Sequence, residues 1–226
     1  MSEWEEKLEA IIEESIRENV TSLAGVPSWM LVLLNRVLEK TGKENLFGVW
    51  DQLEVYFHGG VNFNPYREQY GRLLPGANFK YYEIYNASEG FFAIQDQNNS
   101  QDLLLMLDYG IFYEFIPMDS YGTPAQKVLP LWEVEKEVNY AIVITTNAGL
   151  WRYQIGATVR FTSTYPYRIR VTGRTKHHIN VFGEELIIEN TEAALEKSCA
   201  RTGASIAEYT VAPVFMAGKE QGAHEW

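Results

Sequence analysis

The sequence predicts an α/β protein with a mixed sheet and flanking helices, followed by an incomplete, smaller α+β domain. Three observations carry this prediction. Apolar residues recur with helical spacing near the N-terminus, a strand–helix–strand order follows, and the second half consists of short runs typical of strands. The chain has 226 residues, of which 46% are hydrophobic, so it is long enough to bury a sizeable core.

The first elements are two helices. Apolar residues recur every four positions from Trp4 to Ile16 among Glu and Lys, which indicates an amphipathic helix with one apolar stripe. Residues 21–25 interrupt this pattern, and we interpret them as a break. Pro27 suits the first turn of a new helix, whose buried side is supplied by residues 29–38.

A change of period marks the start of the sheet. From Leu53 apolar residues alternate with polar ones until the run stops at Gly59-Gly60. Residues 65–74 then indicate a helix and residues 79–85 a strand, an order that predicts a parallel pair joined by a crossover. Further strand-like runs are found at 90–94, 103–107, 110–116, 140–146, 158–162 and 168–172.

A composition change marks the expected domain boundary. Residues 1–172 are predicted to form part of the large domain, 173–176 a hinge, and 177–226 an incomplete small domain. The small domain is expected to contain one helix, over 187–202, and at most two strands. The sequence stops at Trp226 where a further strand would be expected to pair, which would leave an open sheet edge.

Composition argues against several classes of function. A formal charge of -11 and a pI near 4.9 oppose nonspecific attraction to nucleic acid, whose phosphates need a basic surface. No apolar run approaches the roughly 20 residues that span a bilayer, and the acidic N-terminus lacks a secretory signal. We therefore expect a cytoplasmic protein without membrane or nucleic-acid partners. The single cysteine, Cys199, excludes an internal disulfide and is interpreted as a buried helix residue.

Residues 85–90, with the sequence YNASEG, lie between two predicted strands and are expected to form a polar loop. Tyr85 suits stacking on a flat base, and Asn86 and Ser88 suit hydrogen bonds to a nucleotide. Glu89 is a hard oxygen ligand of the kind that binds Mg²⁺ beside phosphates. The competing interpretation is an ordinary turn in which Asn86 and Ser88 bond their own backbone.

Positive charge is concentrated at two places. Arg152 lies between Trp151 and Tyr153, where it either pairs with a phosphate or stacks on a ring, and the structural interpretation is favoured for the residue alone. Arg174 precedes Lys-His-His at 176–178, the one local concentration of positive charge in an acidic chain. Anions are expected to dock there.

Taken in order, these motifs resemble the adenylate-forming superfamily. His58-Gly59-Gly60 is similar to its glycine loop, residues 85–89 to its Tyr-x-x-Ser/Thr-Glu motif, and residues 151–156 to its Tyr-Arg-x-Gly-Asp region. Gly173-Arg174 with Ile179 and Gly183 is similar to its hinge motif. A closer resemblance, over essentially the whole chain, is to bacterial members of the Gretchen Hagen (auxin-responsive promoter) acyl-acid amido synthetase family. The stretches that carry it are GVPSW (25–29), YREQY (66–70), YNASEGFF (85–92), FYEFIP (112–117), GLWRY (149–153) and GRTKH (173–177).

The resemblance implies a two-step ligase reaction. A carboxylic acid reacts with ATP, with Mg²⁺ on the phosphates, to give an acyl-adenylate, and an amine or amino acid then displaces AMP. The resemblance implies that the nucleotide site is lined by Gly59, Gly60, Tyr85, Asn86, Ala87, Ser88, Glu89, Ala157 and Arg174. It implies that Glu89 binds the metal, that Glu89 and Arg174 act in catalysis, and that the acyl pocket includes His58, Val61 and Phe91. Neither the acid nor the amine follows from the sequence.

Two departures from the family set limits on this reading. Family members carry an aspartate at the position of Ala157, where its carboxylate accepts hydrogen bonds from both ribose hydroxyls. They also run to roughly twice this length, with a phosphate loop upstream and more of the small domain downstream. We therefore expect a truncated form that binds ATP and Mg²⁺ weakly or not at all and is inactive alone. Its cut surfaces predict self-association.

Two alternatives of other classes stay open. One is a noncatalytic binding or interaction domain that derives from this fold and has lost its chemistry. The other is a subunit that completes its site with a separately encoded partner. An in-frame upstream segment with a Ser-Ser-Gly-Thr-like loop in the flanking DNA would favour truncation over both.

Overall fold

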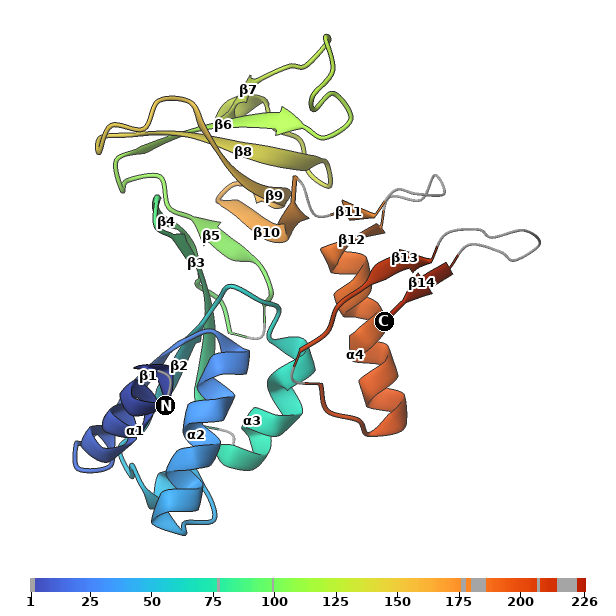
Figure 1. Cartoon of the computed structure of the whole chain (residues 1–226). Coiled ribbons are helices and arrows are strands. Elements are labelled where there is room, and N and C mark those ends of the chain that lie inside the picture. The colour runs from blue at the N-terminus through green and yellow to red at the C-terminus, as the bar shows by residue number, and fades with distance from the viewer. Residues whose placement is uncertain are drawn as a thin grey trace. The chain divides into compact units, whose positions relative to one another are not determined.

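A computed structural model describes residues 3–76, 78–98, 100–175, 178–179, 186–206, 208–214 and 223–226 (Figure 1). The chain divides into two compact units, the first formed by Met1–Ile84 and Ser198–Glu208 and the second by Tyr85–Lys197 and Tyr209–Trp226. The hinge expected at 173–176 stays a prediction. No helix in the described part of the chain is both long and apolar enough to cross a membrane.

The first unit combines three helices with a parallel sheet. Its helices are α1 (Glu3–Ser15), α2 (Pro27–Thr41) and α3 (Arg67–Leu73), with short 3-10 turns η1 (Leu46–Gly48) and η2 (Asn64–Tyr66). Its strands are β1 (Ser22–Gly25), β2 (Val55–His58) and β3 (Lys80–Ala87), in that spatial order. Both pairings are parallel, so the predicted strand–helix–strand crossover is confirmed.

Strand β1 corrects the interpretation of residues 21–25 as a break between helices. The strand has four residues, and Leu23 is its only buried side chain, so no apolar alternation is visible in the sequence. Its extended conformation depends instead on the parallel register with β2, which pairs Gly25 with His58. This tertiary pairing is absent from any local pattern.

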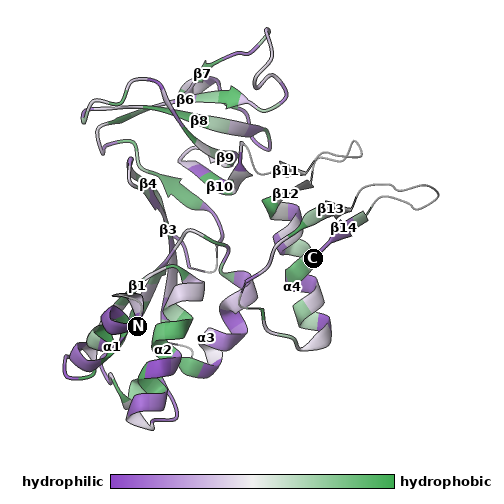
Figure 2. Ribbon diagram, in the orientation of Figure 1, coloured by the Kyte–Doolittle hydropathy of each residue, from purple (hydrophilic) through white to green (hydrophobic). Residues whose placement is uncertain are grey.

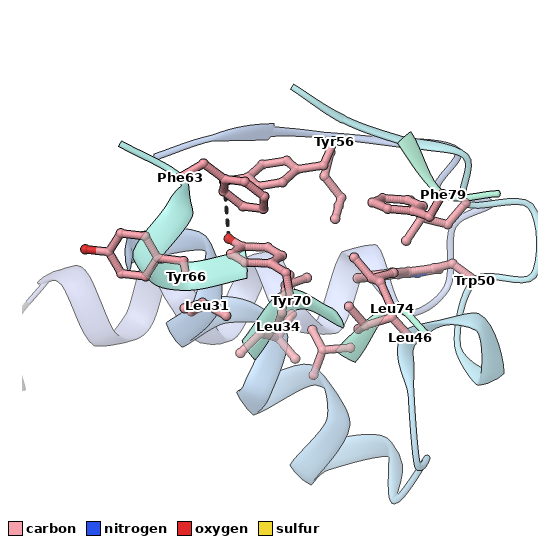
Figure 3. Packing of buried hydrophobic residues seen from close by; sticks show 14 of the residues in the cluster. Leu31, Leu34, Leu46, Trp50, Tyr56, Phe63, Tyr66, Tyr70, Leu74 and Phe79 are labelled. Carbon is pink, nitrogen blue, oxygen red and sulfur yellow. Dashed lines mark hydrogen bonds between the residues drawn. The ribbon is translucent and has the colours of Figure 1, made fainter. Parts of the chain in front are cut away.

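The core of the first unit lies where α2 and α3 pack beneath the sheet (Figure 3). Two buried tyrosines tie the layers together. The Tyr70 hydroxyl donates to the Pro27 carbonyl oxygen at 2.9 Å and lies 3.2 Å from the Tyr56 hydroxyl, which donates to the Gly25 carbonyl oxygen at 2.9 Å. The polar atoms of both rings are thereby satisfied, as burial of a tyrosine requires.

The paired helices α1 and α2 show the predicted amphipathic pattern. Hydrophobic residues are interleaved with hydrophilic ones along both (Figure 2), and Leu8 and Ile12 are buried in the core. On the solvent side Lys40 bonds Glu9 and Glu13. These pairs are largely exposed, so they add little stability beside the apolar packing.

The second unit is dominated by an antiparallel sheet. Its strands are β4 (Gly90–Gln95), β5 (Leu103–Leu105), β6 (Ile111–Pro117), β7 (Leu129–Pro130), β8 (Asn139–Thr146), β9 (Tyr153–Thr164) and β10 (Tyr167–Arg174), with a 3-10 turn η3 (Leu131–Glu133). Their spatial order is β4-β5-β10-β9-β8-β6-β7. The prediction of a mostly β second half and the mixed α/β fold class are both confirmed.

The two faces of this sheet differ. Along β6, Tyr113 and Phe115 join a large buried cluster, whereas Ile116 belongs to a smaller cluster with Val143 of β8. Because side chains alternate along a strand, Glu114 and Ile116 face away from Tyr113. The large cluster therefore lies on one face of the sheet and the smaller one on the other.

The C-terminal segment contains helix α4 (Ile188–Thr202) and two short antiparallel pairs. These pairs are β11 (His178–Ile179) with β12 (Leu186–Ile187) and β13 (Ala212–Val214) with β14 (Ala223–Glu225). The expectation of at most two strands was wrong, because strands of two or three residues are too short to show alternation. Gly183 of the hinge motif, and Lys176 and His177 of the basic stretch that follows Arg174, lie outside the described residues.

Candidate functional site

The motif at residues 85–90 is a tight hairpin. Strand β3 continues through Ala87, and β4 begins at Gly90, so only Ser88 and Glu89 form the turn. The expected loop is therefore corrected: Tyr85 and Asn86 are strand residues that point to opposite faces. Asn86, Ala87 and Ser88 are exposed.

Tyr85 is the best-defined member of this motif. Its ring packs against Phe92 with centroids 5.0 Å apart, and its hydroxyl is buried without a hydrogen-bond partner among the described residues. Burial raises the pKa of the Tyr85 phenol far above its usual value; Arg174 opposes this shift, and Tyr113 and Glu89 add to it. The structure thus brings Glu89 and Arg174, both predicted site residues, within electrostatic range of Tyr85.

Tyr113 on β6 is a candidate site residue that the sequence did not reveal. It is 3% exposed, and its hydroxyl is also buried without a partner in the described part of the chain. Burial raises the pKa of this phenol, which therefore stays neutral and able to donate a hydrogen bond. The sequence signal that could have found it is a tyrosine at a buried position of a predicted strand. A buried phenol normally has a hydrogen-bond partner, so such a tyrosine calls for one.

Ala157 and Arg174 lie directly opposite each other in the β9–β10 ladder. Ala157 is 6% exposed, whereas the Arg174 side chain is exposed. Next to them, the Thr175 backbone N–H donates to the Gly156 carbonyl oxygen at 2.9 Å, which extends the pairing past the end of β10. The position at which family members carry an aspartate is thus held firmly beside the arginine.

The glycine motif after β2 lies in the first unit. A Cβ on Gly59 would stand 2.3 Å from the carbonyl oxygen of Ile84, so no larger residue fits without moving backbone. Gly60 has a φ of 85°, a left-handed conformation that favours glycine. These glycines allow the chain after β2 to pass close to the backbone of β3. Their proximity to adenosine stays a prediction.

The three residues expected in the acyl pocket lie in different surroundings. His58 is 3% exposed and stacks on Phe63 with ring centroids 4.2 Å apart, whereas Val61 is 37% exposed. Phe91 lies in the second unit, with its ring 5.9 Å from that of Tyr109. His58 is thus a core residue of the first unit, and a shared acyl pocket stays a prediction.

His58 gives the first unit a specific acid sensitivity. Burial, with a contribution from Arg67, lowers its pKa from 6.5 to about 4, and its Nδ1 atom is buried without a partner among the described residues. The unfolded chain takes up this proton as the pH falls below 6.5, whereas the folded chain does not until about 4. Stability is therefore lost over that window.

We expect this linkage to amount to about 3 kcal/mol between pH 7 and pH 4. Urea unfolding at a series of pH values, compared with His58→Gln, measures it, because the variant keeps every carboxyl titration and loses only the imidazole. Parallel stability–pH curves for the two proteins would contradict the assignment.

Arg152 was expected to meet either a phosphate or an aromatic ring. In the structure its Nε atom donates to Glu114 Oε2 at 2.9 Å, and no ring in the described part of the chain lies under its guanidinium. The ion pair joins β6 to the residue before β9. The cation–π interpretation is therefore replaced by an ion pair.

The predicted metal ligand, Glu89, is half-buried at the hairpin turn. The described residues contain no group of three or more His, Cys, Asp or Glu side chains that could enclose a metal ion. This donor set does not form a protein cage. It fits the usual mode of Mg²⁺, which takes one or two carboxylates and completes its shell with phosphate and water oxygens.

Comparison with known proteins identifies the same family twice. The GH3 family N-terminal domain matches residues 1–79, and the GH3 family central domain matches residues 104–174. Indole-3-acetic acid-amido synthetase GH3.4 of Arabidopsis thaliana is 28% identical over 166 residues, which are 67% of this chain and 27% of that protein. Probable indole-3-acetic acid-amido synthetase GH3.2 of Oryza sativa subsp. japonica is 26% identical over 223 residues, 88% of this chain and 35% of that protein. The chain thus spans about a third or less of these curated relatives.

Solved structures share the fold. The AtGH3.15 acyl acid amido synthetase in complex with 2,4-DB has a TM-score of 0.71 at 13% identity and covers 96% of this chain and 46% of its own. A 2-hydroxyisobutyryl-CoA ligase in complex with 2-HIB-AMP has a TM-score of 0.60 at 16% identity, with coverage of 84% and 40%. At such identities the likeness shows the fold alone. The two family matches, over residues 1–79 and 104–174, show that this chain belongs to the GH3 family.

Proposed function

We propose that this chain carries the base and ribose side of the ATP site of an acyl-acid amido synthetase, which adenylates a carboxylic acid and then forms an amide with an amine or amino acid. One observation supports this most. Two buried phenols, Tyr85 and Tyr113, have hydroxyls without a partner among the described residues, and both Tyr113 and Arg174 are close enough to act electrostatically on Tyr85. Buried polar atoms normally have partners, so orphaned ones indicate a place that a ligand completes.

The chemistry of the group suits a nucleotide. The Tyr85 ring offers a flat face for a base, and the two neutral hydroxyls can donate to or accept from its edge atoms or the ribose. Arg174 offers up to five N–H donors and a fixed positive charge for the ribose or α-phosphate. Glu89 would hold Mg²⁺, which neutralises phosphate charge when bound and so assists attack by the carboxylate.

The adenylation step needs more than these residues supply. An incoming carboxylate must be held in line with the α-phosphorus, and the leaving pyrophosphate needs its own donors. The described residues offer one exposed cation in this group, Arg174, and the ribose-binding carboxylate is replaced by Ala157. We therefore propose that the chain alone forms no acyl-adenylate. ATP–pyrophosphate exchange above background by the purified chain would overturn this part of the proposal.

Tyr113→Phe is expected to raise the stability of the free protein and to lower its affinity for AMP. In the free protein the substitution removes a buried, unpartnered hydroxyl, so we expect stability to rise by about 1 kcal/mol. With AMP present it removes a hydrogen bond, so we expect affinity to fall about fivefold or more, as the loss of one hydrogen bond does. Urea unfolding and calorimetric titration with AMP measure the two effects.

Tyr140→Phe is the matched control. Tyr140 is buried in the same sheet at 1% exposure, but its hydroxyl accepts a hydrogen bond from the Glu135 backbone N–H at 2.9 Å. Its loss should lower stability and leave AMP binding unchanged. If Tyr113→Phe instead behaved like Tyr140→Phe in both assays, the Tyr113 hydroxyl would have no ligand role.

A further inference from the structure

A concave site lies on the face of the β6–β8–β9 sheet opposite Tyr113. It is a cavity of about 250 Å³ lined by Ile116, Gln126, Val128, Val143, Arg152 and Gln154. Because Glu114 and Ile116 alternate with Tyr113 along β6, this groove and the proposed nucleotide residues are separated by the thickness of the sheet. The nucleotide chemistry proposed above makes no use of it.

The floor of the groove is apolar and is rigidly held. Ile116 and Val143 are 1% and 3% exposed and belong to one buried cluster, with Val128 packed against it. Ile116 lies on β6 and Val143 on β8, and these two strands are paired in the sheet. An apolar floor of fixed shape favours an aliphatic group over a strongly hydrated one.

The rim presents hydrogen-bond donors. The Gln126 Oε1 atom accepts from the Gly122 backbone N–H at 2.8 Å, which fixes its oxygen and leaves its NH₂ group as the free end of the amide. The Gln154 Oε1 atom accepts a hydrogen bond from the Tyr121 hydroxyl at 3.0 Å. The NH₂ group of Gln154 is therefore also available to donate to a ligand. Neither NH₂ group has another partner among the described residues.

Arg152 completes this donor set. Its φ of 46° is a left-handed conformation that is rare for arginine, and it is supported by a hydrogen bond from its backbone N–H to Thr145 Oγ1 at 3.0 Å. Only Nε is engaged, by Glu114, so the two terminal nitrogens remain without a partner in the described part of the chain. Two terminal N–H groups form the edge that binds a carboxylate in bidentate fashion.

The geometry points to a binding site for a short aliphatic monocarboxylate. The apolar floor would hold the hydrocarbon part, and Arg152 with the amides of Gln126 and Gln154 would bind the carboxylate. The cavity volume of about 250 Å³ is below the roughly 300–1,000 Å³ of sites that bury drug-sized molecules, which limits the ligand to a few carbon atoms. Two amide NH₂ groups and the guanidinium of Arg152 favour an anionic ligand over a cationic one.

Isovalerate and its neutral isostere isovaleramide test this site on the whole chain. In ¹H–¹⁵N NMR titrations we expect isovalerate to shift the amides of Gln126, Val143 and Gln154 in a saturable way. We expect isovaleramide to bind at least about tenfold more weakly, since it cannot form the charged bidentate pair. Equal binding of the two, no saturable shifts with isovalerate, or shifts centred on Tyr85 would each overturn the proposal.

Two variants distinguish a ligand-binding Arg152 from a purely structural one. Arg152→Lys keeps the positive charge and places another non-glycine residue in the left-handed conformation, but it loses the two terminal N–H groups that bind a carboxylate in bidentate fashion. Isovalerate should therefore bind about tenfold more weakly. Glu114→Gln removes the carboxylate that competes with the ligand for Arg152. Isovalerate should therefore bind severalfold more tightly, although the Glu114–Arg152 ion pair is lost. Unchanged affinity in Arg152→Lys, or weaker binding in Glu114→Gln, would show that Arg152 serves only to join the strands. Because Tyr113→Phe leaves this face intact, a failure here is distinguishable from failure of the nucleotide site.

Discussion

Gly59→Ala is expected to destabilise the first unit by about 3 kcal/mol, the upper part of the range for overpacking a closed site. The added Cβ would stand 2.3 Å from the Ile84 carbonyl oxygen, a distance that real Cβ contacts do not show. The obstacle is a backbone atom held in the β2–β3 ladder next to the paired residues His58 and Glu83, so no side-chain rotation can relieve it. Urea unfolding of the variant measures the loss.

Gly71→Ala is the matched control for this substitution. Gly71 lies within α3, is exposed, and has no atom within 4 Å of an added Cβ. Alanine is the better helix former, so we expect this variant to be more stable by about 0.5–1 kcal/mol. Equal stability of Gly59→Ala and the wild type would mean that β2 and β3 are not as closely packed as described.

Ala157→Asp is expected to raise nucleotide affinity about 30- to 150-fold, because a carboxylate that accepts from both ribose hydroxyls contributes about 2–3 kcal/mol. Position 157 pairs with Arg174 across the β9–β10 ladder, so the new charge has a partner. Without nucleotide the variant should be less stable than the wild type. Ala157 is 6% exposed, so an aspartate carboxylate at this position would be desolvated. Calorimetric titration with AMP and with ATP measures the affinity.

Ala157→Asn separates the charge from the shape in this experiment. The amide has nearly the size of the carboxylate but a single neutral acceptor oxygen, so we expect only a small part of the gain. Equal affinity of the wild type and Ala157→Asp would sink the idea that the ribose binds at this position. Equal gains for Asn and Asp would indicate that packing, and no ribose hydrogen bond, is responsible.

The longer helices and strands were predictable because each is long enough to show a helical or alternating pattern of apolar residues. The alternation that begins at Leu53 and the helix around Tyr70 gave the parallel crossover, and the run at 140–146 gave β8. Strand β1 and the short pairs β11–β12 and β13–β14 were not predictable. They have two to four residues each, too few to show a side-chain pattern, and β1 depends in addition on its pairing with β2, which is distant in the sequence.

The site was predictable only where a motif identifies it. Tyr85, Glu89 and Arg174 were found through motifs, and in the structure Glu89 and Arg174 lie within electrostatic range of Tyr85. Tyr113 was missed because what distinguishes it is a buried hydroxyl without a partner among the described residues, which is a property of the packed structure. The opposition of Ala157 and Arg174 likewise depends on a register shift between Val171 and Gly173, which no sequence pattern reveals.

The central claim is that Tyr85, Tyr113 and Arg174 form one side of a nucleotide site. A ¹H–¹⁵N NMR titration of the whole chain with AMP tests it most directly, because weak binding is detected and located in the same experiment. We expect saturable shifts at the amides of Tyr85, Glu89, Tyr113 and Arg174, with little change at Gln126 and Gln154 on the opposite face. Saturable shifts confined to other residues, or none at millimolar AMP in the wild type and in Ala157→Asp alike, would contradict it.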